Sequence, residues 1–176
     1  GTLNVAKIIN EGLILLDGTY NITSDFISTG TFFSEAGNVN MTGTAPQLMD
    51  LAISTFNNLT IDNATAVTLS STETEITDSF TINLGKVFKI EADKNLTVTG
   101  TIINNADTSG LVLKSNASGT ASLLHNTIDV PVTVQRYISG EAEDWHFLSA
   151  PVSNQNIGGS WNPSGTFGNG TGYDLY

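Results

Sequence analysis

A short triplet, in which a Thr stands between two apolar residues, recurs along the chain. Alternation of apolar and polar residues at a period of two is typical of β-strands that bury one face. Thr is a good β-former and suits the face that stays in contact with water. The pattern therefore predicts short strands around the triplets at residues 59–61, 67–69, 80–82, 96–98 and 132–134.

Turn-forming residues separate these triplets. Sequences such as Asn-Asn, Asp-Asn and Leu-Gly-Lys favour tight turns, because Asn, Asp and Gly tolerate left-handed backbone conformations. We therefore expect strands of about three to five residues, with a corner every ~7 to 10 residues. The N-terminal part continues the pattern less regularly, with candidate strands at residues 13–16, 20–23, 31–33 and 38–42.

The apolar positions also recur at a longer, nearly constant spacing. It is 20 or 21 residues for the pairs Leu59 and Phe80, Val67 and Val87, and Ile76 and Leu96. One coil of a parallel β-solenoid needs such a period, because each strand stacks on its counterpart in the next coil. We predict an all-β fold, a parallel β-helix with about three short strands per ~21-residue coil over residues 1–130. The preference of parallel crossovers makes it right-handed.

The composition changes after residue 130. Both Trp and three of the four Pro lie there, and a Gly-rich segment precedes the final Tyr-Asp-Leu-Tyr. We expect residues 131–157 to cap the C-terminal end of the solenoid, with Trp145 and Phe147 as its plug. Residues 158–176 are then a Gly-rich linker and the start of a truncated following domain, so that the chain is a piece of a longer protein.

Charge and cysteine content narrow the range of functions. Charged residues make up 13% of the chain, about half the usual share. The net charge of -11 repels a phosphate backbone, so nucleic acid is not an expected partner. The absence of Cys excludes disulfides, thiol catalysis and Cys-ligated zinc. The longest apolar run, residues 12–16, is far too short to span a bilayer.

Two segments resemble a known group of proteins. The run "FNNLTIDNATAVTLSSTETEITDSFTINLGKVFKIEADKNLTVTGTI" is similar to repeats of large secreted and surface proteins of Bacteroidetes. The segment "VQRYISG" followed by "WHFLSAPV" is similar to the stretch that follows the last repeats in those proteins. The resemblance covers about residues 30–176. It implies an adhesin-like β-solenoid region of an exported, cell-surface protein, often a substrate of type IX secretion.

One segment is dense in polar groups that could carry chemistry. Asp144, His146 and Ser149 invite interpretation as a nucleophilic triad, but they lie within six residues of one another. The members of a working triad normally converge from separate segments. We therefore assign the segment a structural role, in which Arg136 forms an ion pair or a stack that orders the cap. The alternative is a carbohydrate site formed with Tyr137 and Trp145.

Carboxylates elsewhere suggest other sites. Glu73 with Glu75, and Glu91 with Asp93, have the i, i+2 spacing of one strand face, and glycosidases use a pair of carboxyl groups. No Arg, Lys or His accompanies them to complete such a site, so a solvated outer face is the preferred interpretation. Turn carboxylates can also bind Ca²⁺, although Asx-turns explain them equally; these are Asp17, Asp62, Asp78, Asp93 and Asp107.

Threonine and asparagine patterns were weighed in the same way. An ice-binding face needs an unbroken Thr ladder, and here Thr68 is expected to stack on Lys89, which breaks it. Several Asn-X-Ser/Thr triplets fit the glycosylation sequon. We interpret them as a turn followed by a strand; they begin at Asn21, Asn40, Asn58, Asn63, Asn95, Asn116 and Asn169.

Together, these observations predict a non-enzymatic extracellular structural or adhesin module of a bacterial surface or secreted protein. It would act as a rigid stalk or present a side face to a surface polysaccharide or a protein. The alternative is a polysaccharide-binding or polysaccharide-degrading β-helix. We assign no catalytic, cofactor-binding or metal-binding residue, and we expect no cofactor.

Overall fold

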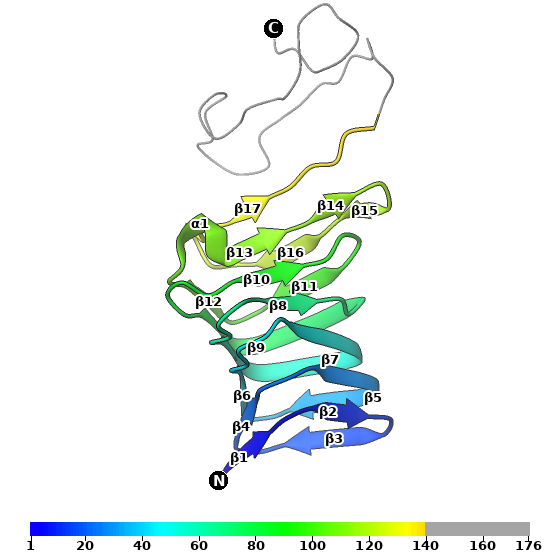
Figure 1. Cartoon of the computed structure of the whole chain (residues 1–176), viewed down its shortest axis with the longest axis vertical. Helices are drawn as coiled ribbons and strands as arrows, with labels where there is room; N and C mark the ends of the chain where they lie inside the picture. The colour runs from blue at the N-terminus through cyan, green and yellow to red at the C-terminus, as the bar shows by residue number, and fades with distance from the viewer. Residues whose placement is uncertain (140–176) are drawn as a thin grey trace, which may run out of the picture. The chain divides into compact units, whose positions relative to one another are not determined.

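A computed structural model describes residues 1–139 of the chain. Short strands dominate it, joined by tight turns and one helical turn (Figure 1). The strands are β1 (Thr2–Val5), β2 (Ile8–Asn10), β3 (Leu13–Leu16), β4 (Thr19–Ile22), β5 (Phe26–Ser34), β6 (Asn38–Met41), β7 (Gln47–Ile61), β8 (Val67–Leu69), β9 (Glu73–Ile82), β10 (Phe88–Ile90), β11 (Asn95–Val98), β12 (Thr101–Asn104), β13 (Leu111–Leu113), β14 (Ser115–Asn116), β15 (Gly119–Thr120), β16 (Ser122–His125) and β17 (Thr133–Val134), and the helix is α1 (Asp107–Gly110).

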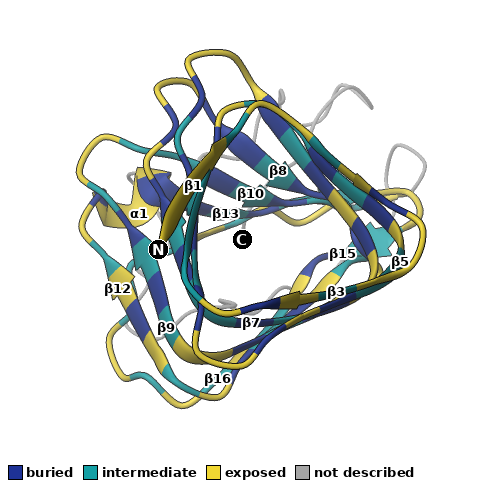
Figure 2. Cartoon of the chain, turned by 90° about the horizontal axis from the view of Figure 1, so that it is seen from below, coloured by how far each residue is buried: buried dark blue, intermediate teal, exposed yellow. Residues whose placement is uncertain are grey.

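The chain winds into a β-solenoid of about six turns, which confirms the predicted fold class. Figure 2 looks along the stack and shows three sides around a buried interior. Face A consists of β1, β4, β6, residues 58–61, residues 79–82 and β12. Face B consists of β2, residues 26–28, residues 47–51, β8, β10, β13 and β17. Face C consists of β3, residues 31–34, residues 53–56, residues 73–76, β11 and β16.

Parallel pairing sets the coil spacing, and the predicted spacing is correct in places and shifted in others. Leu59 pairs with Phe80 and Thr68 with Lys89, as expected. Val67 pairs with Phe88 instead of Val87. Ile76 pairs with Val98 instead of Leu96, because this coil is two residues longer at the turn that precedes β11. A fixed period thus identifies the coils, whereas turn length decides the register.

Three strands are longer than the three to five residues predicted. β5, β7 and β9 have 9, 15 and 10 residues because backbone pairing continues around a corner of the solenoid. The register shifts between Ser28 and Thr31 and between Phe56 and Asn58 mark such bends. An extra residue on one strand lets it bend while the flanking hydrogen bonds are kept. Local turn residues therefore mark only some of the corners.

Inward-facing side chains form columns that run from coil to coil. At one corner, the rings of Phe26, Phe32 and Phe56 pack together with centroid distances of 4.7 to 6.2 Å. All three rings are fully buried, and each such aromatic pair contributes about 0.5–1.5 kcal/mol beyond its area of burial. On face A, one column contains Tyr20, Val39, Leu59, Phe80 and Ile102.

A buried amide network fastens one turn of the solenoid to its neighbours. The Gln47 side chain accepts hydrogen bonds from the Gly43 amide (3.0 Å) and from Asn63 Nδ2 (2.7 Å), and it donates to the carbonyl of Ile22. Asn63 also donates to the carbonyl of Ala45 and accepts from the Thr65 amide. These partners belong to successive coils, so the network links turns that lie far apart in sequence.

We expect Asn63→Ala to lower the free energy of unfolding by about 1–3 kcal/mol, because Gln47 and nearby backbone groups lose buried hydrogen-bond partners. Urea denaturation followed by circular dichroism measures this loss. Asn116 is the matched control, because it is exposed and its side chain accepts a bond only from the Ser118 amide. An Asn63→Ala variant as stable as Asn116→Ala would contradict a structural role for the network.

The described C-terminal coils depart from the simple pattern. Asn104 ends β12, and its Nδ2 donates to the carbonyls of Asp107 and Pro131, both at 2.7 Å. This side chain thereby joins α1 to the next coil. Pairing of β13 with β17 continues the stack to Val134, past the expected limit at residue 130. The expected cap at 131–157 lies mostly outside the described residues, and the expected linker at 158–176 lies wholly outside them.

Candidate functional site: a polar groove on face A

The paired carboxylates singled out in the sequence lie on the outside of the solenoid. Glu73 is exposed and Glu75 half-buried on face C, where the cross-coil neighbours of Glu75 are Thr55 and Thr97. Glu91 forms an ion pair with Lys114, with Nζ–O distances of 2.7 and 2.8 Å. Asp93 occupies a turn with a φ of 63°. The structure therefore gives Glu91 an ionic partner and leaves the pair on face C in solvent.

The turn aspartates do not gather at one place. Asp62 is 3.6 Å from Lys86 Nζ, and Asp107 opens α1 with a φ of 57°. Within residues 1–139, no group of three or more His, Asp or Glu side chains is arranged to hold a metal ion. The Asx-turn interpretation is the one that the turn conformations of Asp93 and Asp107 support.

The dense polar segment near the C-terminus is described only at its start. Arg136 and Tyr137 are both exposed, and the Tyr137 amide donates a 2.9 Å hydrogen bond to Ser115 Oγ. The proposed partners of Arg136, the triad candidates and the plug residues lie outside the described residues; they are Glu141, Glu143, Asp144, Trp145, His146, Phe147 and Ser149.

The threonine ladder breaks, as expected, but at a different residue. Thr60 pairs with Thr81, and the next position in this outward column is Ile103. On face B, Thr68 pairs with Lys89. An apolar or charged side chain at these positions interrupts any flat array of hydroxyl groups. Face A therefore offers hydroxyl groups only over a short part of the stack.

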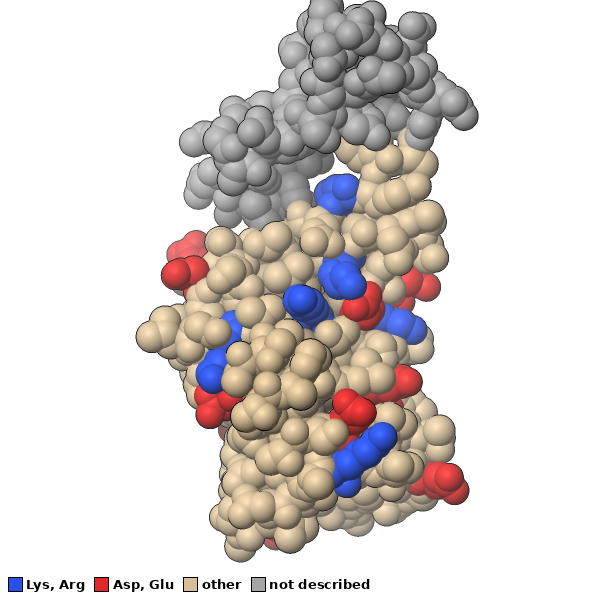
Figure 3. All heavy atoms as spheres, viewed as in Figure 1, with Lys and Arg blue, Asp and Glu red and all other residues tan. Residues whose placement is uncertain are grey.

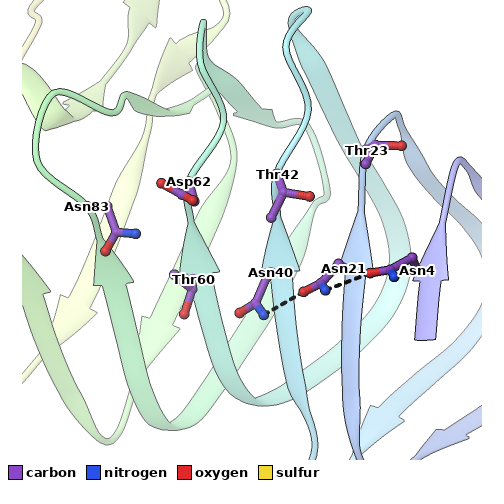
Figure 4. A pocket seen from close by; sticks show the side chains of 8 residues that line it. All are labelled: Asn4, Asn21, Thr23, Asn40, Thr42, Thr60, Asp62 and Asn83. Atoms are coloured by element: carbon purple, nitrogen blue, oxygen red, sulfur yellow. Dashed lines mark hydrogen bonds between the residues drawn. The ribbon is translucent and has the colours of Figure 1, made fainter. Parts of the chain in front are cut away.

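A polar groove of about 470 Å³ crosses face A, perpendicular to its strands. Figure 4 shows that its side chains form two rows. The first row contains outward residues within the strands, and the second contains the residue that follows each strand. The first row is Asn4, Asn21, Asn40 and Thr60, and the second is Thr23, Thr42, Asp62 and Asn83.

The first row is held together by a ladder of side-chain amides. Asn21 Nδ2 donates to Asn4 Oδ1 at 2.7 Å, and Asn40 Nδ2 donates to Asn21 Oδ1 at 2.8 Å. Because the strands are parallel and in register, identical side chains at one position lie one coil apart and can bond to each other. The ladder orients the amides in one direction and ends at Asn40, beside Thr60 (Figure 4).

Backbone hydrogen bonds hold the second row in place. The amides of Thr42, Asp62 and Asn83 donate to carbonyls of the preceding coil at 2.8, 2.9 and 3.1 Å. Each of these residues therefore continues the stack for one step after its strand has ended. Its side chain points outward, because the residue before it points into the core and side chains alternate along an extended chain.

The local sequence signal for the groove is polar, apolar, polar at the end of a strand. Asn21-Ile22-Thr23 and Asn40-Met41-Thr42 follow it, 19 residues apart. Our interpretation of these sequons as a turn followed by a strand is wrong here, because Asn21 and Asn40 lie within β4 and β6 and the turn comes after them. The signal was present in the sequence, but its meaning required the register.

The groove carries little net charge. Asp62 is its one acidic lining residue, and its carboxylate is 3.6 Å from Lys86 Nζ. The side of the solenoid drawn in Figure 3 is mostly uncharged, and several of its acidic and basic groups lie next to each other. The groove thus differs from the overall chain, whose net charge is -11.

In the described part of the chain, no helix is long and apolar enough to cross a membrane. No protein-family model matches the sequence, and neither a curated protein nor a solved structure matches the chain.

Proposed function

We propose that this chain is a non-enzymatic structural module of a bacterial surface or secreted protein, which acts outside the cell as a rigid stalk and as a side face for binding. The observation that carries the proposal is the continuous stacking of buried columns and paired strands through about six coils. Each coil shares its backbone hydrogen bonds and core with its neighbours, which makes a stiff body.

Two further observations support the proposal. The outer surface is rich in Ser, Thr and Asn, and the core of the described part contains few charged groups that would require specific partners. The resemblance of residues 30–176 to repeats of secreted Bacteroidetes proteins supports an extracellular location and export by type IX secretion. The paired Glu73 and Glu75 lie on face C, away from the groove on face A, so the groove does not supply two carboxyl groups for glycoside hydrolysis.

Hydrogen exchange tests the stalk function. We expect the amides of β7, β8, β9 and β10 to exchange together and slowly, because opening one of these strands breaks pairing with the coils on both sides. Mass spectrometry after pepsin digestion measures the rates by segment. Independent, fast exchange of these strands would contradict a stiff rod.

Location and catalysis need separate measurements. Protease treatment of intact producing cells should cleave the protein if it is on the cell surface, and a cytoplasmic marker should survive as the control. Reducing-sugar and unsaturated-uronate assays on polysaccharides should show no turnover. Turnover of any glycan by the purified chain would overturn the non-enzymatic assignment.

A further inference from the structure

We propose that the face A groove binds a linear, uncharged polysaccharide that lies along the stack and crosses the strands. The inference rests on the proposed function, since it assigns a ligand class and a site to the binding face of the module. It is carried by the hydrogen-bonding capacity of the groove, its low charge and its repetition from coil to coil.

The amide ladder leaves groups free for a ligand. An Asn side chain has two N–H donors and an oxygen with two lone pairs. Asn21 uses one donor toward Asn4 and one lone pair toward Asn40, so one donor and one lone pair remain. Adjacent sugar hydroxyls each donate and accept, so a pair of them matches this combination. The ladder also holds the amides in place, which lowers the entropy cost of binding.

Other lining residues add unpaired capacity. Within residues 1–139, the side chains of Thr60 and Asn83 make no hydrogen bond to the protein, and both line the groove. Both are half-buried, so they are held by their surroundings while still facing solvent. A saccharide in the groove would meet hydroxyl and amide groups from four successive coils.

Charge favours a neutral ligand over an acidic one. Lys86 balances the only acidic lining residue, Asp62. A polyanion would have to approach a chain of net charge -11 without a cluster of cations in the groove to attract it. Uncharged hydroxyl groups pay no such penalty, and the groove offers them donors and acceptors alike.

The repeat of the solenoid favours a polymer. The strands of adjacent coils lie about 4.8 Å apart, so similar polar groups recur at that interval along the groove. An extended peptide cannot add to these strands, because β4 and β6 are already paired on both sides. A chain of sugar units can instead engage successive coils, and each further contact is then intramolecular.

The test compares the 176-residue chain with two matched double variants. Thr60→Val with Asn83→Ala removes two groove side chains that make no internal hydrogen bond in the described part. Thr97→Val with Asn95→Ala makes the same chemical changes on face C. Thermal unfolding should show that both variants are folded. The probes are laminarin, glucomannan, xylan and dextran, with polygalacturonate as the anionic probe.

Affinity electrophoresis and isothermal titration calorimetry measure binding. We expect the chain to bind at least one of the four neutral probes, with affinity rising as its oligosaccharides lengthen. Loss of two hydrogen-bonding groups should weaken the groove variant about tenfold, while the face C variant stays within about twofold of the unchanged protein.

Three outcomes would overturn the inference. They are absence of binding to all four neutral probes, equal affinity of the groove variant and the unchanged protein, and preferential binding of polygalacturonate. Hydrogen exchange on the same preparations separates the two proposals. A stiff solenoid that binds none of the neutral probes overturns the ligand assignment alone, whereas independently exchanging coils overturn the stalk function as well.

Discussion

Replacing Phe56 with Ala should lower the free energy of unfolding by about 3–5 kcal/mol, the usual loss for a buried Phe. The ring is fully buried and packs on Phe32 with a centroid distance of 4.7 Å. Its removal leaves a cavity where two coils share their core, and paired backbone on both sides prevents the coils from closing it. Urea denaturation followed by circular dichroism and by intrinsic fluorescence measures the effect.

Phe33→Ala is the matched control for this experiment. Phe33 occupies the same corner of the chain but points outward on face C, with 37% of its surface exposed. Its truncation should cost about 1 kcal/mol or less, because little packing is lost at a surface position. Equal losses for the two variants would show that the aromatic cluster does not form the core of these coils.

Gly100→Ala should lower the free energy of unfolding by about 3 kcal/mol. A Cβ atom at this position would overlap the backbone carbonyl of Asp78 in the preceding coil. Backbone cannot rotate away as a flexible side chain does, so the two turns must separate. This separation would strain the pairing of β9 with β11 and β12, which lie on either side of the glycine. Thermal and urea unfolding both report the loss.

The control is Gly12→Ala, a substitution of the same kind at another turn. Its Cβ would meet only Asn10 Oδ1, at 4.0 Å, so no atom has to move. We expect a change of no more than about 0.5 kcal/mol. A stable Gly100→Ala variant would mean that the coils are spaced further apart at this turn than in the structure described.

The coil architecture followed from the sequence because two periods were visible in it. Triplets such as Phe80-Thr81-Ile82 show the period of two, and their recurrence near 21 residues shows the coil. The corners were harder to place. Residues 47–56 contain no run of Gly, Asn or Asp, yet β7 bends there and belongs to all three faces. The bend depends on the coils above and below it, which a local pattern does not contain.

The groove could not be located before the register was known. Asn4, Asn21 and Asn40 are 17 and 19 residues apart, outside the period of ~20 to 22 inferred from the later coils. The shorter N-terminal coils bring these residues into one row all the same. In contrast, the expectation that Glu73 and Glu75 share one strand face needed only the alternation of an extended chain, and both lie outward on face C.

The sequence by itself determined the all-β class, the approximate length of a coil and which residues of each triplet are buried. These properties depend on the alternation of side chains and on turn-forming residues, which are local. Only the tertiary structure decided which residues are neighbours between coils, where the long strands bend and that eight polar residues line one groove. Such contacts join positions about 20 residues apart. A change of one or two residues in a turn moves every side chain above it to a new partner, or to the other face of the strand.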